Sequence, residues 1–158
     1  MFGADGDFTP RWCRMNSRRC CNAAFAATAL AFLNAATATA DPAGLWRGSD
    51  GGTTRIAPCG TGYCGFLASV VPPNDPDTGR PQTDKYNPDP EKRNRPLVGV
   101  QVLFSMQPNG PGKWSGQLYY YGNGRTYSGN LLERDANNIR VEGCWFGICG
   151  GENLTRVR

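Results

Sequence analysis

Histidine is absent from the 158-residue chain. It is the side chain that most often moves protons near neutral pH, and its ring is the commonest protein ligand of metal ions. Its absence excludes Ser-His-Asp and Cys-His catalysis and every metal site that needs an imidazole. No other pairing of a nucleophile with a base is visible along the chain. The sequence therefore predicts a protein that is not an enzyme and needs no cofactor.

The chain also lacks an apolar run long enough to cross a membrane as a helix, which takes about 20 residues. The longest run, Ala23–Ala36, follows Arg18 and Arg19 and precedes the small-residue site Ala38-Thr39-Ala40. This order is typical of a secretory signal peptide that is cleaved, although a buried Ala-rich helix is an alternative. We therefore expect export to the periplasm or beyond, with no membrane span.

Two boundaries follow from this N-terminal signal. Met15 stands directly before the basic residues, so we expect it to be the true start. Residues 1–40 are predicted to be an N-terminal extension and signal peptide that are removed. Residues 41–158 then form the mature chain, whose length suits one domain.

A basic stripe, which nucleic-acid binding requires, is missing from the predicted mature chain. Residues 41–158 contain 13 Lys and Arg against 11 Asp and Glu, and the two signs are interspersed. The one basic cluster, Lys92-Arg93-Asn94-Arg95, directly follows acidic residues and suits a solvated loop. We therefore expect no binding to nucleic acid. We also expect the protein to be a monomer.

Long helical periodicity is missing after residue 40 as well, and short β-rich segments alternate with Gly, Pro, Asn and Asp instead. This pattern is typical of an all-β barrel or sandwich. Glycines such as Gly99, Gly116 and Gly129 fall inside the predicted strands, as the bends of a closing barrel require. We predict a small antiparallel β-barrel of about eight strands, at 45–47, 53–57, 63–71, 97–106, 114–121, 125–132, 139–145 and 154–157.

Four of the seven cysteines, Cys59, Cys64, Cys144 and Cys149, lie in the predicted mature chain. An even number in a small exported domain favours disulfides. A four-thiolate zinc site or a redox pair is a lesser alternative, because four intervening residues suit neither well. Each pair flanks a predicted turn, where the two Cβ atoms can approach closely. We predict the local disulfides Cys59–Cys64 and Cys144–Cys149 rather than crossed pairs.

The segment 72–96 is rich in proline and nearly free of apolar residues. A loop of more than about 12–15 residues is often functional, and we expect this one, with Tyr86, to cover the barrel mouth. Its carboxylates could bind a hard cation weakly, or Asp84 and Asp89 could pair as the catalytic carboxylates of glycoside hydrolases do. A solvated turn suits them better, so no metal site is predicted. The acidic residues of this loop are Asp75, Asp77, Asp84, Asp89 and Glu91.

Aromatic residues gather in the predicted strand 114–121. Because strand residues alternate between faces, Tyr119 and Tyr121 share one face, opposite Trp114 and Tyr120. One face is expected to be core, and the other could present an exposed aromatic surface to a partner. The candidates for ligand or partner contact are Tyr86, Trp114, Tyr119, Tyr121 and Tyr127.

The first and last predicted strands carry a structural pair. Lipocalins begin with Gly-x-Trp and place an Arg from a late element over that Trp, where the two form a cation–π stack. Gly44-Leu45-Trp46 and Arg156 stand at the corresponding places. We expect Trp46 and Arg156 to stack and to close the barrel floor.

Further short motifs follow in a set order between residues 44 and 157. They are Gly44-Leu-Trp46, Cys59 to Gly65, Asp84 with Asn87-Pro88, Arg95-Pro-Leu97 with Gly99, Trp114-Ser-Gly116, Gly124-Arg-Thr-Tyr127, Gly143-Cys144 and Thr155-Arg156-Val157. In these motifs the chain resembles an uncharacterised family of small exported bacterial proteins, the domain of unknown function DUF2147. The resemblance implies a lipocalin-like barrel and brings no known activity. The family usually has Trp where this chain has Leu154.

These observations predict an exported, non-enzymatic protein that holds a small apolar or amphipathic ligand in a β-barrel cup. Barrels of about eight strands either fill with side chains or hold one small ligand. The alternative is an envelope module that binds a partner protein or the cell wall through the face of Tyr119 and Tyr121.

Overall fold

The computed structural model describes residues 41–158, so the predicted signal peptide, extension and start at Met15 lie outside the described residues. Eight strands and one short 3-10 helix, η1, make up the regular structure of this part of the chain. Their bounds are β1 Gly44–Arg47, β2 Thr53–Cys59, β3 Gly62–Ser69, η1 Pro90–Lys92, β4 Gln101–Pro108, β5 Lys113–Tyr120, β6 Arg125–Asp135, β7 Asn138–Trp145 and β8 Ile148–Arg156.

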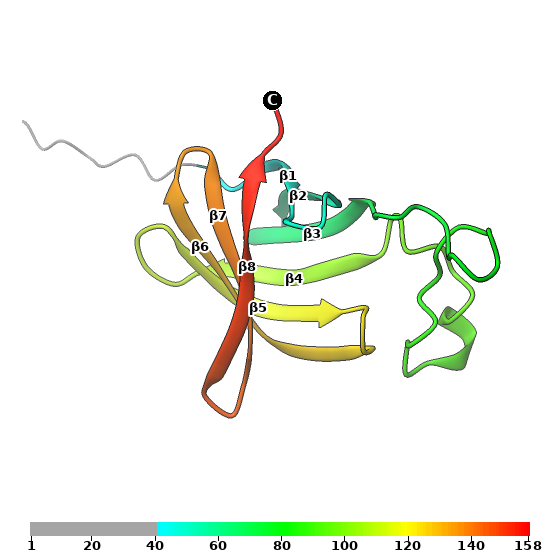
Figure 1. Ribbon diagram of the computed structural model, residues 1–158. Coiled ribbons are helices and arrows are strands. Elements are labelled where there is room, and N and C mark those ends of the chain that lie inside the picture. Colours follow the sequence, from blue (N-terminus) through cyan, green and yellow to red (C-terminus); the bar gives the residue numbers. More distant parts are fainter. Residues whose placement is uncertain (1–40) are drawn as a thin grey trace, which may run out of the picture. The chain divides into compact units, whose positions relative to one another are not determined.

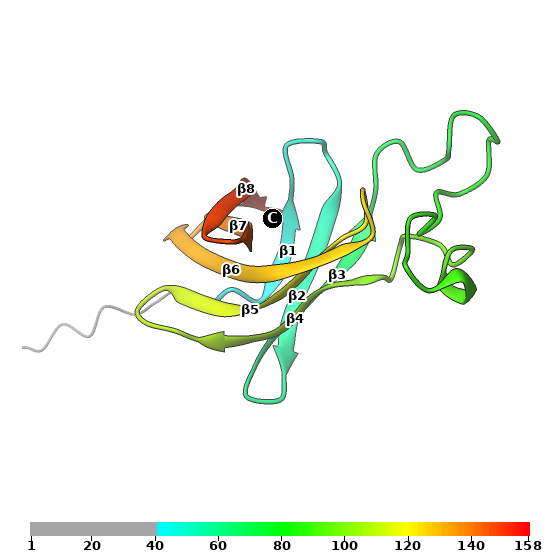
Figure 2. The ribbon, with the colours of Figure 1, turned by 90° about the horizontal axis from the view of Figure 1, so that it is seen from below.

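The strands form one closed antiparallel barrel in the order of the sequence, as Figures 1 and 2 show. Each strand pairs with the next, and β8 returns to β1, where Trp46 pairs with Arg156 and Arg47 with Thr155. Closure removes the unpaired edges that an open sheet would expose. The all-β class and the eight strands predicted from the sequence are confirmed.

The antiparallel order gives the barrel two different ends. The turns β1–β2, β5–β6 and β7–β8 and the long β3–β4 connection lie at one end, which we call the mouth. The turns β2–β3, β4–β5 and β6–β7 lie at the other end, which we call the floor. The first described residues and the C-terminal end of β8 also lie at the floor.

The barrel interior is packed most densely toward the floor. Trp46, Met106 and Leu131 are fully buried there, and Ile56 is almost so. Such side chains each contribute about 1.5–3 kcal/mol on burial. They belong to a single cluster that extends from β1 to β8. This packed layer leaves the mouth half of the barrel available for a cavity.

The fourth strand begins later than the sequence predicts. Leu97–Val100 were expected to open it, but β4 starts at Gln101. Gly99 has a φ of 91°, which interrupts the extended backbone. Leu97 and Val100 are nevertheless buried, so their apolar character reflects packing beneath the connection and not a strand.

The Pro-rich loop 72–96 lies beside the mouth and does not cover it. Figures 1 and 2 show the green connection extending away from the ends of β3 and β4. None of its described residues lines the cavity inside the barrel, and Tyr86 is 55% exposed. The predicted lid with Tyr86 over the mouth is therefore wrong. The loop finds its own polar anchor on the outer side of β5, which holds it away from the opening.

Candidate functional site

The barrel floor is closed by the stack that Gly-x-Trp and Arg156 predict. The Arg156 guanidinium carbon lies 4.2 Å from the Trp46 ring centroid. Its N–H groups donate to the carbonyls of Ala43 and Asp41, each at 2.8 Å, and Ala136 at 3.0 Å. A Cβ on Gly44 would lie 2.6 Å from the guanidinium, which explains the glycine. This end has a structural role.

The mouth end encloses a cavity of about 510 Å³. That volume lies within the range of about 300–1,000 Å³ typical of small-molecule sites. The inner part of the cavity is lined by aliphatic side chains, and tyrosines and two carboxylates lie nearer the opening. The aliphatic side chains are Leu67, Val102, Leu103, Leu118, Val141 and Leu154.

The structure brings together three of the five predicted contact residues. Tyr119, Tyr121 and Tyr127 line the cavity, and the Tyr127 hydroxyl accepts a hydrogen bond from Asn123 Nδ2 at 2.7 Å. Trp114 lies at the floor instead, where its ring meets Tyr63 edge-on at 5.9 Å between centroids. Tyr86 is also remote, and the Tyr119 hydroxyl is bonded to Asp84 of the loop, so the candidates for ligand contact reduce to Tyr121 and Tyr127.

The exposed aromatic face predicted for Tyr119 and Tyr121 is not present. Tyr119 is only 7% exposed, because the loop 72–96 packs over it, and Tyr121 packs against the core. Alternation along β5 holds, but an alternating face is exposed only if no other segment covers it. Tyr120 is the half-exposed member of the group.

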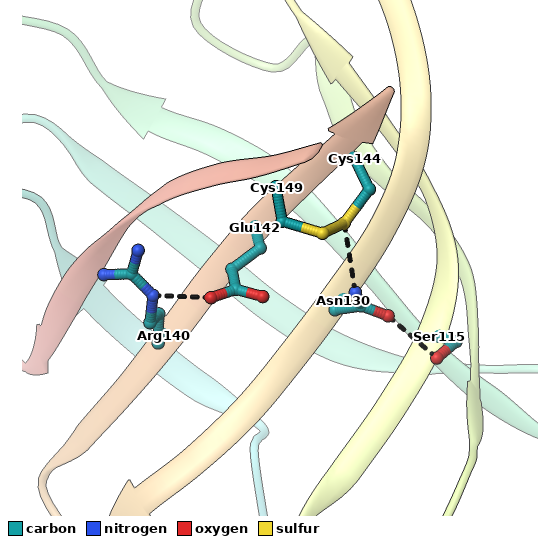
Figure 3. The surroundings of a disulfide bond; sticks show 6 residues. All are labelled: Ser115, Asn130, Arg140, Glu142, Cys144 and Cys149. Carbon is teal, nitrogen blue, oxygen red and sulfur yellow. Dashed lines mark hydrogen bonds and ion pairs between the residues drawn. A yellow bond between two sulfur atoms is a disulfide. The ribbon is translucent and has the colours of Figure 1, made fainter. Parts of the chain in front are cut away.

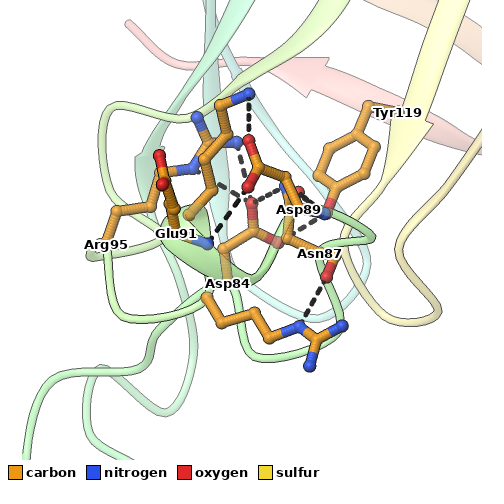
Figure 4. A network of polar contacts seen from close by, with 8 residues as sticks. Asp84, Asn87, Asp89, Glu91, Arg95 and Tyr119 are labelled. Carbon is orange, nitrogen blue, oxygen red and sulfur yellow. Dashed lines mark hydrogen bonds and ion pairs between the residues drawn. The ribbon is translucent and has the colours of Figure 1, made fainter.

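A buried polar network anchors the loop to β5 (Figure 4). Asp84 is fully buried and accepts hydrogen bonds from Tyr119 Oη at 2.6 Å and from Asn87 Nδ2 at 2.7 Å. Arg95 adds two more, from Nη2 at 2.8 Å and Nε at 3.1 Å. Burial, followed by the nearby Asp84 carboxylate, raises the pKa of Tyr119 to about 12. The network is satisfied internally, so it holds the loop and leaves no open ligand site.

Two other carboxylates of the loop, Asp75 and Asp89, are also engaged by the protein. Asp75 accepts the backbone N–H of Asp77 and pairs with Lys85 at 3.3 Å, which together lower its pKa. Asp89 pairs with Lys92 at 2.8 Å, and this contact and the N–H of Glu91 lower its pKa. Asp84 and Asp89 thus form no open catalytic pair.

Both predicted disulfides are present, and they lie at opposite ends of the barrel. Cys59–Cys64 closes the β2–β3 turn at the floor, and Cys144–Cys149 closes the β7–β8 turn at the mouth. Figure 3 shows the second bond, with Asn130 Nδ2 donating to Cys144 Sγ and Glu142 nearby. Glu142, Cys144 and Cys149 cluster closely, but the two sulfurs are bonded to each other and Glu142 pairs with Arg140. The cluster therefore offers no thiolate to a metal.

Comparison with known proteins identifies the family. Residues 44–156 match the family described as "Uncharacterized protein conserved in bacteria (DUF2147)". The chain belongs to the DUF2147 family. Three residues of the family motifs quoted above belong to the network that anchors the loop of this DUF2147 barrel. They are Asp84 and its hydrogen-bond donors Asn87 and Arg95. No curated protein matches the chain.

A solved structure has the same fold. Its title is "Protein HP1028 from the human pathogen Helicobacter pylori belongs to the lipocalin family". The match has a TM-score of 0.65 at 19% sequence identity and covers 76% of this chain and 85% of that chain. The likeness shows that this DUF2147 protein has a lipocalin-like barrel. Among residues 41–158, no helix is long and apolar enough to cross a membrane.

Sequence reasoning missed two carboxylates at the mouth of this DUF2147 barrel. Asp50, in the β1–β2 turn, and Glu152, in β8, both line the cavity. Glu152 Oε2 accepts from Ser49 Oγ at 3.0 Å and from Ser49 N at 3.3 Å. The two residues are about a hundred positions apart in the chain, and no local motif marks either. The sequence offered one indication for Glu152. It lies two residues before the apolar Leu154 in a strand, so both side chains face the barrel interior.

The largest exposed apolar side chains of this DUF2147 protein lie at the β7–β8 turn. Phe146 is 91% exposed and Ile148 80%, and the Trp145 ring lies between Phe146 and Tyr127 at 5.2 and 6.0 Å. Phe146 also has a φ of 49°, unusual for a residue other than glycine. Among the described residues, the most exposed aromatic side chain, Phe146, therefore lies at this turn.

Proposed function

We propose that this protein is an exported, non-enzymatic binding protein that holds one small apolar or amphipathic molecule in the mouth cavity of its barrel. The single observation that carries the proposal is the cavity of about 510 Å³ above a packed floor. A barrel filled by its own side chains would leave no such space.

The lining supports an amphipathic ligand. Aliphatic side chains such as Leu67 and Leu118 form the inner part, and Tyr120 and Tyr121 lie near the opening. Ligand sites in proteins usually combine a mainly apolar wall with a few polar groups that fix orientation. The lipocalin-like fold, shared with a protein whose title places it in the lipocalin family, favours the same use of the barrel.

Two further features support export and the lack of an enzymatic role. Two disulfides in one small domain fit an oxidising compartment outside the cytoplasm. Three of the loop carboxylates, Asp75, Asp84 and Asp89, are paired with Lys or Arg. The chain also has no histidine to act as a general base. We expect the periplasm or the exterior as the location, and a monomer as the state.

Titration with the neutral dye N-phenylnaphthylamine, whose fluorescence rises in an apolar site, tests the proposal. Gly150 lines the cavity, and a Cβ there would meet no atom within 4 Å, so Gly150→Phe should fill the space without a clash. Gln117→Phe adds the same ring to the exposed face of β5 and is the matched control.

The wild type and Gln117→Phe should bind the dye alike, at one dye per chain. Gly150→Phe should bind it at least about tenfold more weakly, which corresponds to about 1.4 kcal/mol. Saturable binding that Gly150→Phe leaves unchanged would place the ligand elsewhere. No saturable binding by the wild type would refute the proposal.

A further inference from the structure

The cavity carries charge of one sign only. Among the described residues that line it, Asp50 and Glu152 are charged and none is Lys or Arg. Neither carboxylate is in any of the ion pairs found in the described part of the chain. Two carboxylates beside a low-dielectric cup, without a counterion from the protein, focus a negative potential at the opening.

The two carboxylates face a common space. A Cβ built on Gly48 would lie 3.0 Å from Asp50 Oδ1 and 3.2 Å from Glu152 Oε2. The two oxygens are therefore no further apart than the sum of these distances. Gly48 has no side chain to occupy the space, and any larger residue there would crowd both carboxylates. A compact group of positive charge could approach both acids at once.

Each carboxylate has an oxygen left for a ligand. The Gly52 N–H donates to Asp50 Oδ1 at 2.9 Å, and Ser49 donates only to Glu152 Oε2. No hydrogen bond of the described residues reaches Asp50 Oδ2 or Glu152 Oε1. The protein thus fixes the orientation of both groups through one oxygen and leaves the other free.

Tyrosine rings complete the surroundings of these carboxylates. Tyr120 and Tyr121 line the cavity, with ring centroids 5.9 Å apart. Burial, then the negative charges of Asp50 and Glu152 among its neighbours, raise the pKa of Tyr121, which places its hydroxyl within their field. Aromatic faces attract cations, and organic ammonium groups most characteristically. Carboxylates and rings therefore favour the same kind of ligand group.

We propose that the ligand is a cationic amphiphile, whose ammonium head group is held between Asp50 and Glu152 beside Tyr120 and Tyr121 and whose apolar tail enters the cavity. This inference rests on the proposed binding function and specifies its ligand class. An anionic lipid or fatty acid would place its head group against two uncompensated carboxylates, which disfavours it.

A purely structural role for the carboxylates does not account for their charge. β1 pairs with β8 at only two positions, and the bonds from Ser49 to Glu152 extend this seam toward the mouth. A glutamine at position 152 could accept the same two hydrogen bonds through its amide oxygen. Asp50→Asn with Glu152→Gln therefore removes the charge and keeps the seam.

The experiment compares three ligands with one tail, used below their micelle concentrations. Dodecyltrimethylammonium, dodecanol and laurate compete for the bound naphthylamine dye in low-salt buffer at neutral pH. The proteins are the wild type, Asp50→Asn with Glu152→Gln, and the control Asp77→Asn with Glu91→Gln. The control removes the same charge from the exposed loop beside the barrel.

The wild type and the control should bind the ammonium compound at least about tenfold more tightly than laurate, which is about 1.4 kcal/mol. In Asp50→Asn with Glu152→Gln this preference should fall about tenfold, with the affinity for dodecanol unchanged. Equal affinity of the wild type for all three compounds, or tighter binding of laurate, would overturn the inference and leave the binding function standing. If neither the dye nor any dodecyl compound binds, the proposed function itself fails.

Discussion

The Tyr119 hydroxyl donates a hydrogen bond of 2.6 Å to Asp84 Oδ1 and so joins β5 to the loop 72–96. The contact explains how a segment with so few apolar residues holds one conformation. Asp84, at the centre, receives donors from three side chains and is itself fully buried. The β5–β6 turn also fits the loop closely, since a Cβ on Gly124 would overlap the Tyr86 carbonyl oxygen.

Removing the charge at the centre of this network should destabilise the fold. Asp84→Asn replaces one acceptor oxygen by an NH₂ group that faces other donors. Leaving buried polar groups unsatisfied costs about 1–3 kcal/mol. The Arg95 side chain is 40% exposed, so water can solvate it in part. We therefore expect the free energy of unfolding to fall by about 2 kcal/mol. Urea unfolding followed by tryptophan fluorescence measures it.

Asp77→Asn is the control for this change. Asp77 lies in the same loop, is exposed and accepts no side-chain hydrogen bond among those found. Its free energy of unfolding should stay within about 0.5 kcal/mol of the wild type. If Asp84→Asn has no larger effect than Asp77→Asn, the network does not hold the loop.

Tyr119 should give the fold a characteristic response to high pH. Its pKa is about 12 in the folded chain and about 10 when unfolded, so the folded state holds the proton more tightly. The stability that this provides is complete below pH 10 and is lost as the pH rises to 12. The difference in phenolate absorbance between the wild type and Tyr119→Phe should therefore titrate near pH 12. A difference curve centred near pH 10 would contradict the burial of this hydroxyl.

Local pattern made much of the barrel predictable. Strand alternation and Gly-rich turns gave eight strands in sequence order, and a barrel of adjacent hairpins needs no long-range information beyond its closure. The disulfides follow from the same hairpins, since Cys144 pairs with Cys149 across the β7–β8 ladder. The stack of Arg156 on Trp46 was predictable because a lipocalin-like motif marks both residues.

Contacts between distant segments could not be predicted in this way. The position of the loop depends on Asp84 meeting Tyr119, and these residues are 35 positions apart with no periodic pattern in the loop. The charged mouth depends on the β1–β2 turn meeting β8, a consequence of closure. The cavity depends on how far side chains fill the barrel, which reflects three-dimensional packing and not their order in the chain.

Arg156 should be needed as a guanidinium and not only as a positive charge. It stacks on Trp46 and donates to carbonyls on two segments, which a lysine ammonium cannot reproduce in one plane. Cation–π contacts contribute about 0.5–2 kcal/mol and hydrogen bonds from charged donors about 1.5–3 kcal/mol. Since Arg156 is partly exposed, we expect the free energy of unfolding to fall by about 2 kcal/mol in Arg156→Ala and by about 1 kcal/mol in Arg156→Lys.

Arg134→Ala is the matched control at the same end of the barrel. Arg134 is exposed, and no hydrogen bond or ion pair of its side chain is found among the described residues. Thermal unfolding should show little change for Arg134→Ala. If Arg156→Lys unfolds at the same temperature as the wild type, a positive charge alone is sufficient at the floor.

Phe146 should limit the stability of the β7–β8 turn. Phe146 and Gly147 form a two-residue turn between the paired Trp145 and Ile148, with φ values of 49° and 82°. Two positive φ values are typical of the type I′ turn, which prefers Asn-Gly. Phe146→Asn should therefore stabilise the fold by about 0.5 kcal/mol, net of the lost ring contact with Trp145.

Phe146→Ala is the control. It loses the ring and keeps the strained backbone, so it should not stabilise the fold. Thermal unfolding of both variants measures the difference, and equal midpoints would show that the turn stores no strain at this position.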